Sequence, residues 1–337
     1  MKNGRAGNTG IRVIVFLGMG TLLFLILMSY GLKQSFKPRE NTRVPAAAAQ
    51  SPFDADRAWA DLEHIVGLGP RPSGSEAMTT QQQYILRSLK KAGLETRQQN
   101  FDAETPRGTL PMVNIWGVVR GTRPGVIVLS NHYDTKYLPN IDFVGANDGA
   151  STTAWMLEMA RCFGAERDGR TLWLVFFDGE EAQADWSKTD SLYGSRHMVK
   201  TLRETGELAT IDALINVDMI GDCYLSISKD GGAPPWLSEI VWNTAARYDY
   251  EAHFGSFPAG IEDDHIPFRE AAIPALELID FSYGGSQLDH KKNWHTAEDR
   301  LDKLCPGSLR AVGDVIYHAI VVIDGQLDTI GTATDGQ

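Results

Sequence analysis

The sequence predicts a single α/β domain with a mixed, mainly parallel central sheet flanked by helices, preceded by an N-terminal transmembrane helix. Short apolar segments alternate with amphipathic helical patterns, which is typical of strands covered by helices. Polar clusters follow several of these apolar segments, at the strand ends where sites in open α/β sheets lie. Near the N-terminus, the twenty residues 13–32 carry no charge, about the length needed to cross a bilayer.

Five strands and five helices are expected in the domain. The strand segments are rich in Val, Ile, Leu and Phe, and the helical segments place apolar residues on one face. The expected strands are Val113–Val119, Val126–Ser130, Leu172–Phe177, Ala213–Val217 and Ala275–Ile279. The expected helices are Phe53–Val66, Thr79–Ala92, Ala150–Phe163, Ser191–Leu202 and Leu309–Val322.

The chain is divided into five segments by composition. We expect a short N-terminal tail (1–12), a transmembrane anchor (13–32), a linker (33–52), a catalytic domain (53–325) and a C-terminal tail (326–337). The apolar segment is longer than that of a cleaved signal, so an uncleaved signal-anchor is expected and a cleaved signal is the alternative. Basic residues flank it on both sides and do not orient it. The short tail before it and the large domain after it favour a catalytic domain outside the cytoplasm.

Charge and cysteine content restrict the function classes. The chain has 32 basic and 43 acidic residues, a net charge of −11, which argues against a nucleic-acid partner. Cys162, Cys223 and Cys305 are too few for a disulfide framework and fit no zinc motif. We interpret them as buried or incidental thiols, with one disulfide allowed. The sequence does not indicate an oligomeric state.

Candidate zinc ligands lie at the ends of the predicted strands. Zinc prefers His nitrogen and carboxylate oxygen ligands. Each candidate also has an ordinary structural interpretation, such as helix N-capping for an aspartate before a helix. Convergence of all of them on one sheet edge favours a metal site, and Glu180 could stay unligated beside a ligand and move protons. The candidate ligands are His132, Asp148, Glu181, Asp218 and His295.

The same residues resemble a known family. His132-Tyr133-Asp134, Gly145–Asp148, Glu180-Glu181, Asp218 and His295 are similar to the motifs of the M28 zinc aminopeptidases and their relatives. The resemblance covers roughly Asp54 to Ile323. Three stretches resemble the glutaminyl cyclases within that family more closely: Phe176–Ala182 with Trp186 and Asp190–His197, then Glu262–Phe268, and Trp294–Thr296 with Glu298-Asp299.

The resemblance implies a role for each of these positions. Asp148, Glu181 and His295 would hold one Zn²⁺, and Glu180 would be the general acid and base. Asp218 and Asp263 would form an acidic network around Glu180, and Trp186 and Trp294 would line the substrate pocket. The implied reaction converts an N-terminal glutamine of a peptide or protein to pyroglutamate and releases ammonia. His197 and His265 are expected to be structural.

The chain departs from the cyclases at three places. The cyclases carry a histidine where this chain has Glu277. The loop Asp280–Asn293 is longer than in the animal enzymes and should reshape the pocket rim. The animal enzymes also carry a cysteine pair at the positions of Asn131 and Thr153, and that pair is absent. The first two departures bear on substrate preference.

Two alternative functions remain open. An M28 aminopeptidase would use two zinc ions, with His132 and Asp218 completing a second metal site and Asp148 bridging both. Trp186 with Asp190–His197, and the run 263–265, favour the cyclase instead. A catalytically inactive ectodomain that binds a partner is the other alternative, and the intact ligand set argues against it.

Overall fold

The computed structural model describes residues 51–285 and 292–334. The expected membrane segment 13–32 and most of its linker lie outside the described residues, as does part of the loop Asp280–Asn293. Within the described part, one helix is long and apolar enough to cross a membrane, at Pro306–Ile330 in α8. Most of that stretch is buried against the rest of the domain, as is usual for a core helix.

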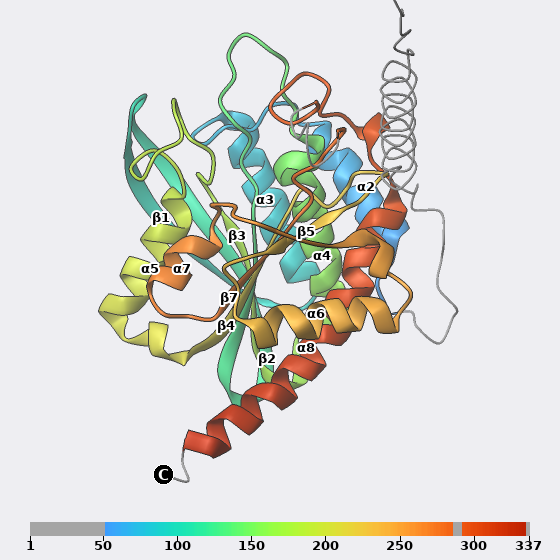
Figure 1. The fold of residues 1–337 in the computed structure, drawn as a ribbon. Helices are drawn as coiled ribbons and strands as arrows, with labels where there is room; N and C mark the ends of the chain where they lie inside the picture. Colours follow the sequence, from blue (N-terminus) through green and yellow to red (C-terminus); the bar gives the residue numbers. More distant parts are fainter. Residues whose placement is uncertain (1–50, 286–291, 335–337) are drawn as a thin grey trace, which may run out of the picture. The chain divides into compact units, whose positions relative to one another are not determined.

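A five-stranded mixed sheet forms the centre of the domain (Figure 1). β4 is parallel to its neighbours β2 and β7, and β1 is antiparallel to β2. A separate two-stranded parallel sheet pairs β5 with β6. The expectation of a mixed, mainly parallel sheet is therefore confirmed. The strands are β1 (Glu95–Thr105), β2 (Gly108–His132), β3 (Glu166–Phe177), β4 (Ile211–Asp218), β5 (Ile227–Asp230), β6 (Phe254–Ala259) and β7 (Ala275–Ile279).

The long strand β2 contains two of the predicted strands. β3 pairs with both of its halves: Val119 pairs with Leu172 and Ile115 with Phe176, whereas His132 pairs with Phe177. The first half is therefore antiparallel to β3, and the second half is parallel to it. Because the chain reverses between these halves, β2, β3, β4 and β7 place their carboxyl ends at the same end of the sheet.

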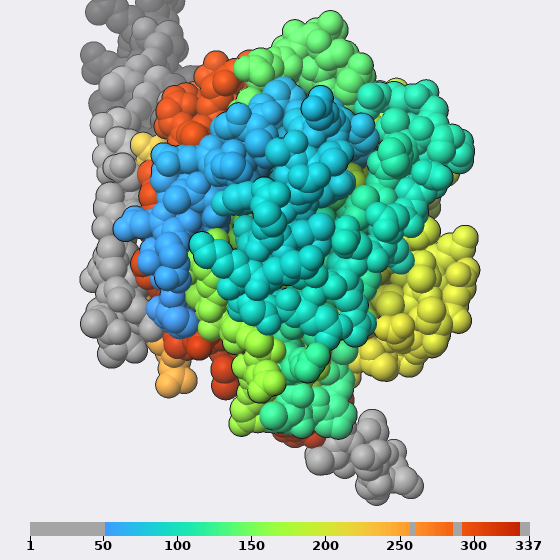
Figure 2. All heavy atoms as spheres, turned by 180° about the vertical axis from the view of Figure 1, so that it is seen from behind, coloured from blue at the N-terminus to red at the C-terminus, as the bar shows by residue number. Residues whose placement is uncertain are grey.

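Helices cover both faces of this sheet (Figure 1). On one face, α2, α3, α4, α6 and α8 share one large buried core with the strands. On the other face, α5 and α7 pack over a second cluster that includes Trp173, Phe177 and Phe268. Seen from behind, the residues of α2, α3 and β1 (blue to cyan) cover much of the surface (Figure 2). The helices are α2 (Ala55–Val66), α3 (Glu76–Lys91), α4 (Thr152–Phe163), α5 (Tyr193–Thr205), α6 (Pro235–Arg247), α7 (His265–Glu270) and α8 (Pro306–Thr334).

Local capping sets where the first helices begin. Asp54 accepts from the backbone N–H groups of Asp56 and Arg57 at the start of α2, and Ser75 accepts from Met78 at the start of α3. Asp148 has no such role, because it lies in the turn Ala146–Ser151 with φ −80° and ψ 100°, before α4 begins. N-capping, the structural alternative for an aspartate before a helix, therefore does not apply to Asp148.

The C-terminal tail expected at 326–337 is wrong for residues 326–334, because α8 continues to Thr334. Leu327 belongs to the large core. The next residue in α8, Asp328, accepts hydrogen bonds from Arg170 at 2.7 Å and from Arg123 at 2.6 Å. These contacts hold the last turns of the helix against β2 and β3.

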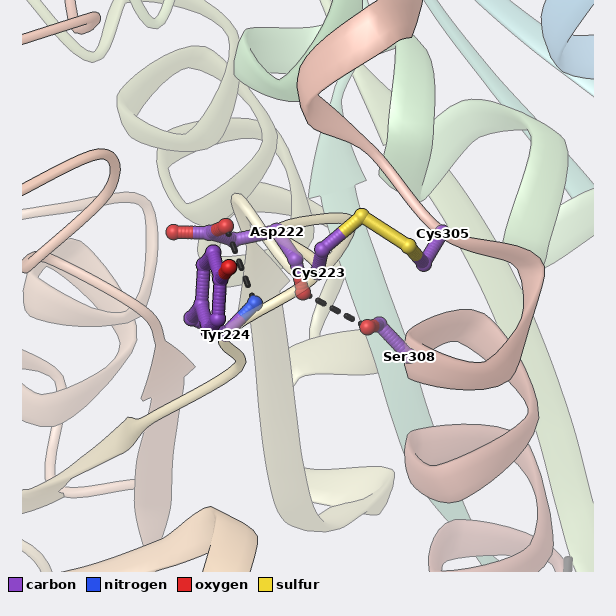
Figure 3. Close-up of a disulfide and its surroundings, with 5 residues drawn as sticks. All are labelled: Asp222, Cys223, Tyr224, Cys305 and Ser308. Atoms are coloured by element: carbon purple, nitrogen blue, oxygen red, sulfur yellow. Dashed lines mark hydrogen bonds between the residues drawn. A yellow bond between two sulfur atoms is a disulfide. The ribbon is translucent and has the colours of Figure 1, made fainter. Parts of the chain in front are cut away.

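One disulfide joins Cys223 to Cys305 (Figure 3). Cys162 is a free thiol. The interpretation as incidental thiols is therefore wrong for this pair, which is the one disulfide that the sequence allowed. The partners are 82 positions apart, so spacing could not pair them. The positions of the animal cysteine pair are also neighbours here: Asn131 Nδ2 donates to Thr153 Oγ1 at 3.3 Å.

Candidate active site

A pocket of about 440 Å³ lies beyond the carboxyl ends of β3, β4 and β7. Most of the side chains that the sequence singled out line it, although they come from five separate segments of the chain. His132 is not among the lining residues and is almost fully buried beneath them. The predicted residues that line the pocket are Asp148, Glu180, Glu181, Trp186, Asp218, Asp263, Trp294 and His295.

Three of these side chains form a cluster that fits a zinc ion. His295 Nε2 lies 2.8 Å from Glu181 Oε1 and 3.3 Å from Asp148 Oδ2. Asp148 Oδ2 is buried and makes no hydrogen bond to any described residue, which is costly for a carboxylate oxygen unless a cation approaches it. One imidazole and two carboxylates with donor atoms within 4.8 Å of one another match the ligands of a catalytic zinc, which keeps one position open.

A second cluster shares Asp148 with the first. His132 Nε2 lies 3.2 Å from Asp148 Oδ1 and 3.1 Å from Asp218 Oδ1. All three side chains are buried, and their donor atoms also lie within 4.8 Å of one another. The structure thus brings together both ligand sets considered from the sequence, with Asp148 between them. The arrangement fits either one ion or two.

Asp134 orients both Glu180 and Glu181 and also approaches His132. Its buried carboxylate accepts from Glu180 N at 3.2 Å and from Glu181 N at 3.3 Å. The same carboxylate lies 3.4 Å from His132 Nδ1. Carboxylates of this kind fix the ring orientation of metal-binding histidines. Sequence reasoning gave Asp134 no role, although its position two residues after His132 was an available signal.

Asp299 holds the turn that carries Asp148. Its two oxygens accept from Asn147 N at 2.7 Å and from Asp148 N at 3.1 Å. The Tyr283 hydroxyl donates to the same carboxylate at 2.8 Å. Asp299 lies four residues after His295, so it also links the two ligand segments. Asp299 belongs to one of the motifs shared with the cyclases, but the motif alone does not predict this contact.

The backbone around the site adopts conformations that few side chains allow. Gly149 has a φ of +84°, and a Cβ there would come 2.6 Å from the Asp134 carbonyl oxygen. His295 and Met219, which follows Asp218, have φ values of 54° and 47° in the left-handed region. Such conformations persist where surrounding contacts hold them, often at functional sites. In this structure these conformations accompany ligand side chains whose donor atoms lie close together.

The electrostatics of the first cluster favour a bound cation. Burial raises the pKa of Asp148, but the neighbouring imidazoles of His132 and His295 outweigh this and hold that pKa well below its usual range. Burial lowers the pKa of His295, but Glu181 and Asp148 raise it to about 9. Lys136, which the sequence analysis did not identify, donates to Glu181 Oε2 at 3.3 Å. A metal ion would displace the proton from His295 and take its place between the carboxylates.

Glu180 lies beside this cluster but outside it, with its side chain at the pocket wall. Burial, and then the negative charge of Asp263, raise the pKa of Glu180 well above its usual range. Asp263 is itself almost fully buried, and its pKa is raised by burial and then by Glu277. A carboxyl group whose pKa is raised in this way can hold a proton and release it again, which suits general acid–base chemistry.

Glu277, where the cyclases carry a histidine, pairs with a histidine from another element. Its Oε2 atom accepts from Asn216 Nδ2 at 2.9 Å and lies 2.8 Å from His265 Nδ1. Burial raises the pKa of Glu277 and, together with Arg269, lowers that of His265 to about 4. His265 is not part of either metal cluster, in line with its expected structural role.

Aromatic side chains border the pocket. Trp186 is 41% exposed and donates through Nε1 to Glu262 Oε2 at 3.3 Å. Trp294 stacks on His295 with ring centroids 3.9 Å apart. Trp186 and Trp294, the two expected pocket residues, therefore lie at the pocket wall. Trp294 directly precedes the candidate ligand His295 in the chain. His197 stacks on Phe101 instead, at 4.2 Å, and does not line the pocket.

Comparison with known proteins connects this site to a family. The family model of peptidase family M28 matches residues 114–320, which hold every candidate zinc ligand. The chain belongs to this family. Among curated relatives, a glutaminyl-peptide cyclotransferase of Drosophila melanogaster is 30% identical over 258 residues, covering 69% of this chain and 71% of the relative.

Solved structures share the fold over nearly their whole length. A crystal structure of an Acidobacteriales bacterium glutaminyl cyclase is 37% identical, with a TM-score of 0.78, and the match covers 85% of this chain and 99% of that one. A Zn-dependent exopeptidase from Parabacteroides distasonis is 26% identical, with a TM-score of 0.71, over 80% of this chain and 98% of that one. A glutaminyl cyclase and a Zn-dependent exopeptidase are therefore both among the structural neighbours.

Proposed function

We propose that this protein is a zinc-dependent glutaminyl-peptide cyclotransferase. It converts the N-terminal glutamine of peptides or proteins to pyroglutamate and releases ammonia. The observation that carries the proposal is the intact Glu180, held outside the Asp148–Glu181–His295 cluster in a chain similar to glutaminyl cyclases over most of its length.

The residues of the pocket account for the chemistry. A zinc ion on Asp148, Glu181 and His295 would supply polarisation of the γ-amide carbonyl. Glu180 accepts a proton from the α-amine as its nitrogen attacks the carbonyl carbon of that amide, and then donates that proton to the departing ammonia. Trp186 and Trp294 confine amine and amide in one pocket, so that ring closure gains from proximity.

The experiment that tests this proposal uses the full-length protein in detergent, supplied with zinc. It is incubated with a mixture of two peptides, one with N-terminal glutamine and one with N-terminal leucine, and the products are analysed by mass spectrometry. Loss of ammonia from the glutamine peptide, and its absence in the Glu180→Gln variant, would support the cyclase. Two unchanged peptides, with zinc shown to be bound, would contradict it.

A second candidate function is that of a di-zinc aminopeptidase. The His132–Asp148–Asp218 cluster favours it, because it offers a second metal site next to the first. The structural similarity to a Zn-dependent exopeptidase points the same way. In the peptide experiment this function would remove a whole residue from either peptide, with Glu180 activating a water molecule.

We also propose that residues 13–32 anchor the protein in a bilayer by a single pass, with the catalytic domain outside the cytoplasm. The uncharged length of the segment supports an anchor. The Cys223–Cys305 disulfide supports the location, because such bonds persist in oxidising compartments. Resistance of the membrane-bound protein to alkaline carbonate extraction, and cleavage of its domain by protease added outside intact cells, are expected. Release by carbonate would contradict the anchor.

A further inference from the structure

The Cys223–Cys305 disulfide joins the segment that follows β4 to the segment that precedes α8 (Figure 3). Backbone hydrogen bonds pair the same two segments. Cys305 N donates to Gly221 O at 2.9 Å, and Cys223 N donates to Lys303 O at 3.2 Å. The Ser308 hydroxyl donates to Asp222 O at 2.6 Å. The bridge therefore fixes the separation of two segments that already run side by side.

Each of the two segments holds one side of the turn that carries Asp148. From the first, Gly221 N donates to Asn147 Oδ1 at 2.7 Å. From the second, Asp299 accepts from Asn147 N at 2.7 Å and from Asp148 N at 3.1 Å. Asp148 is the carboxylate that both metal clusters share. The turn therefore lies between two segments whose distance the disulfide sets.

The two segments also carry further metal-ligand candidates. Asp218 lies five residues before Cys223, and His295 lies ten residues before Cys305. Glu181, in contrast, is positioned by Asp134 at the end of β2. A shift between the two bridged segments would therefore move Asp148 and His295 relative to Glu181. Such a shift would change the separation of the three zinc ligands.

We propose that the Cys223–Cys305 disulfide is a positioning element of the metal site. In its oxidised form it keeps Asp148 and His295 at the separation that zinc binding needs. Reduction by a dithiol, which transfers two electrons and two protons to give two thiols, weakens zinc retention. Both cysteines are only half-buried, so a small reductant can reach them. The inference rests on the zinc site of the proposed function.

The test measures zinc release from the full-length holoprotein in detergent. The reference is the Cys162→Ser variant, which keeps the bridge and removes the free thiol. The test variant carries Cys223→Ser and Cys305→Ser in addition. Zinc transfer to a chromogenic chelator is followed well below the melting temperature of both proteins. Because loss of outer contacts of a metal site usually lowers affinity about 10- to 100-fold, release from the variant should be faster by roughly that factor.

Two controls separate positioning from general stability. Val241→Ala opens a cavity in the buried face of α6, outside both bridged segments, and should lower the melting temperature without speeding zinc release. Reduction of the reference protein with a phosphine that does not chelate zinc should speed release, and reoxidation should restore the slow rate.

Equal release rates with and without the bridge would overturn the inference. Equally fast release from Val241→Ala at a matched melting temperature would also overturn it, because stability alone would then explain the effect. Cyclisation of a glutamine peptide by the reference protein is measured in parallel. Bridge-dependent release without cyclisation would leave the inference standing and contradict the proposed function, whereas a reference protein that retains no zinc would contradict both.

Discussion

The Nδ1 atom of His265 lies 2.8 Å from the Oε2 atom of Glu277, in a pair that is almost completely buried. The glutaminyl cyclases that the sequence resembles carry a histidine at the position of Glu277. Here the imidazole comes from α7 and the carboxyl group from β7. The acidic network next to Glu180 therefore still includes an imidazole, supplied from a different position in the chain.

This pair should be coupled in stability. Glu277→Ala and His265→Ala should each lower the free energy of unfolding by about 1–3 kcal/mol, because each removes one member of a close, buried polar pair. The double variant should lose less than the sum of the two, since both partners are then gone. Urea unfolding of the four proteins measures this difference. Strict additivity would mean that the two side chains do not interact.

Glu180→Gln should remove catalysis and leave the metal site intact. The amide cannot accept or return a proton, so kcat should fall by about 10²- to 10⁴-fold. Zinc content and melting temperature should stay unchanged, because Glu180 is not one of the clustered ligand candidates. Glu298→Gln, an exposed glutamate outside the pocket, is the matched control and should keep wild-type kinetics. Comparable kcat values for the two variants would exclude Glu180 as the base.

Histidine substitutions should reveal the metal count. With one ion on Asp148, Glu181 and His295, the His295→Ala variant should lose zinc, and His132→Ala should keep close to one ion per chain. Elemental analysis of dialysed proteins gives these numbers. Two ions in the wild-type protein, reduced to one by His132→Ala, would instead favour the aminopeptidase.

Trp186→Ala should weaken substrate binding more than it slows the reaction. The indole stands at the pocket wall, and its Nε1–H group donates to Glu262, which is not a candidate metal ligand. We expect a several-fold rise in KM with kcat changed little. Trp242→Phe, on α6 and outside the pocket, serves as the control. An unchanged KM for Trp186→Ala would place the substrate elsewhere.

Stability should depend on pH through Asp280, which starts the long rim loop. Burial, and then the nearby Asp222, raise the pKa of Asp280 to about 7. The pKa of an aspartate in the unfolded chain is about 3.9. The folded state thus binds the proton more tightly than the unfolded state does. The contribution of Asp280 to the free energy of unfolding is therefore complete below about pH 4 and is lost as the pH rises to about 7. Asp280→Asn should flatten this part of the stability profile. Parallel urea midpoints for variant and wild type between pH 4 and 8 would refute this assignment.

Elements with a strong apolar pattern could be predicted from the sequence. β7 has the predicted bounds, because Ala275–Ile279 is a short apolar run in which every residue is buried. β1 was missed because it is an edge strand with Ala103 as its one buried residue. Its burial alternates from Gln99 to Thr105, but too few of the inward residues are apolar to give a strand pattern. α6 was also missed, although Leu237, Val241 and Ala245 have helical spacing.

The candidate ligands could be predicted because their residue types converge at strand ends. The residues that position these ligands could not be predicted. Asp299, for example, accepts hydrogen bonds from backbone N–H groups about 150 positions away in the chain, and such contacts leave no local sequence pattern. The pairing of Cys223 with Cys305 could not be predicted for the same reason. Contacts of this range depend on how the segments pack, which residue spacing does not record.

The length of α8 has a practical consequence for recombinant work. A fragment cut after residue 325 would lack Asp328, and Arg123 and Arg170 would each lose a carboxylate partner at the end of the sheet. It would also expose the apolar surface that Leu327 covers. Soluble fragments intended for crystallisation should therefore extend at least to Thr334, even though the last predicted apolar stripe ends twelve residues earlier.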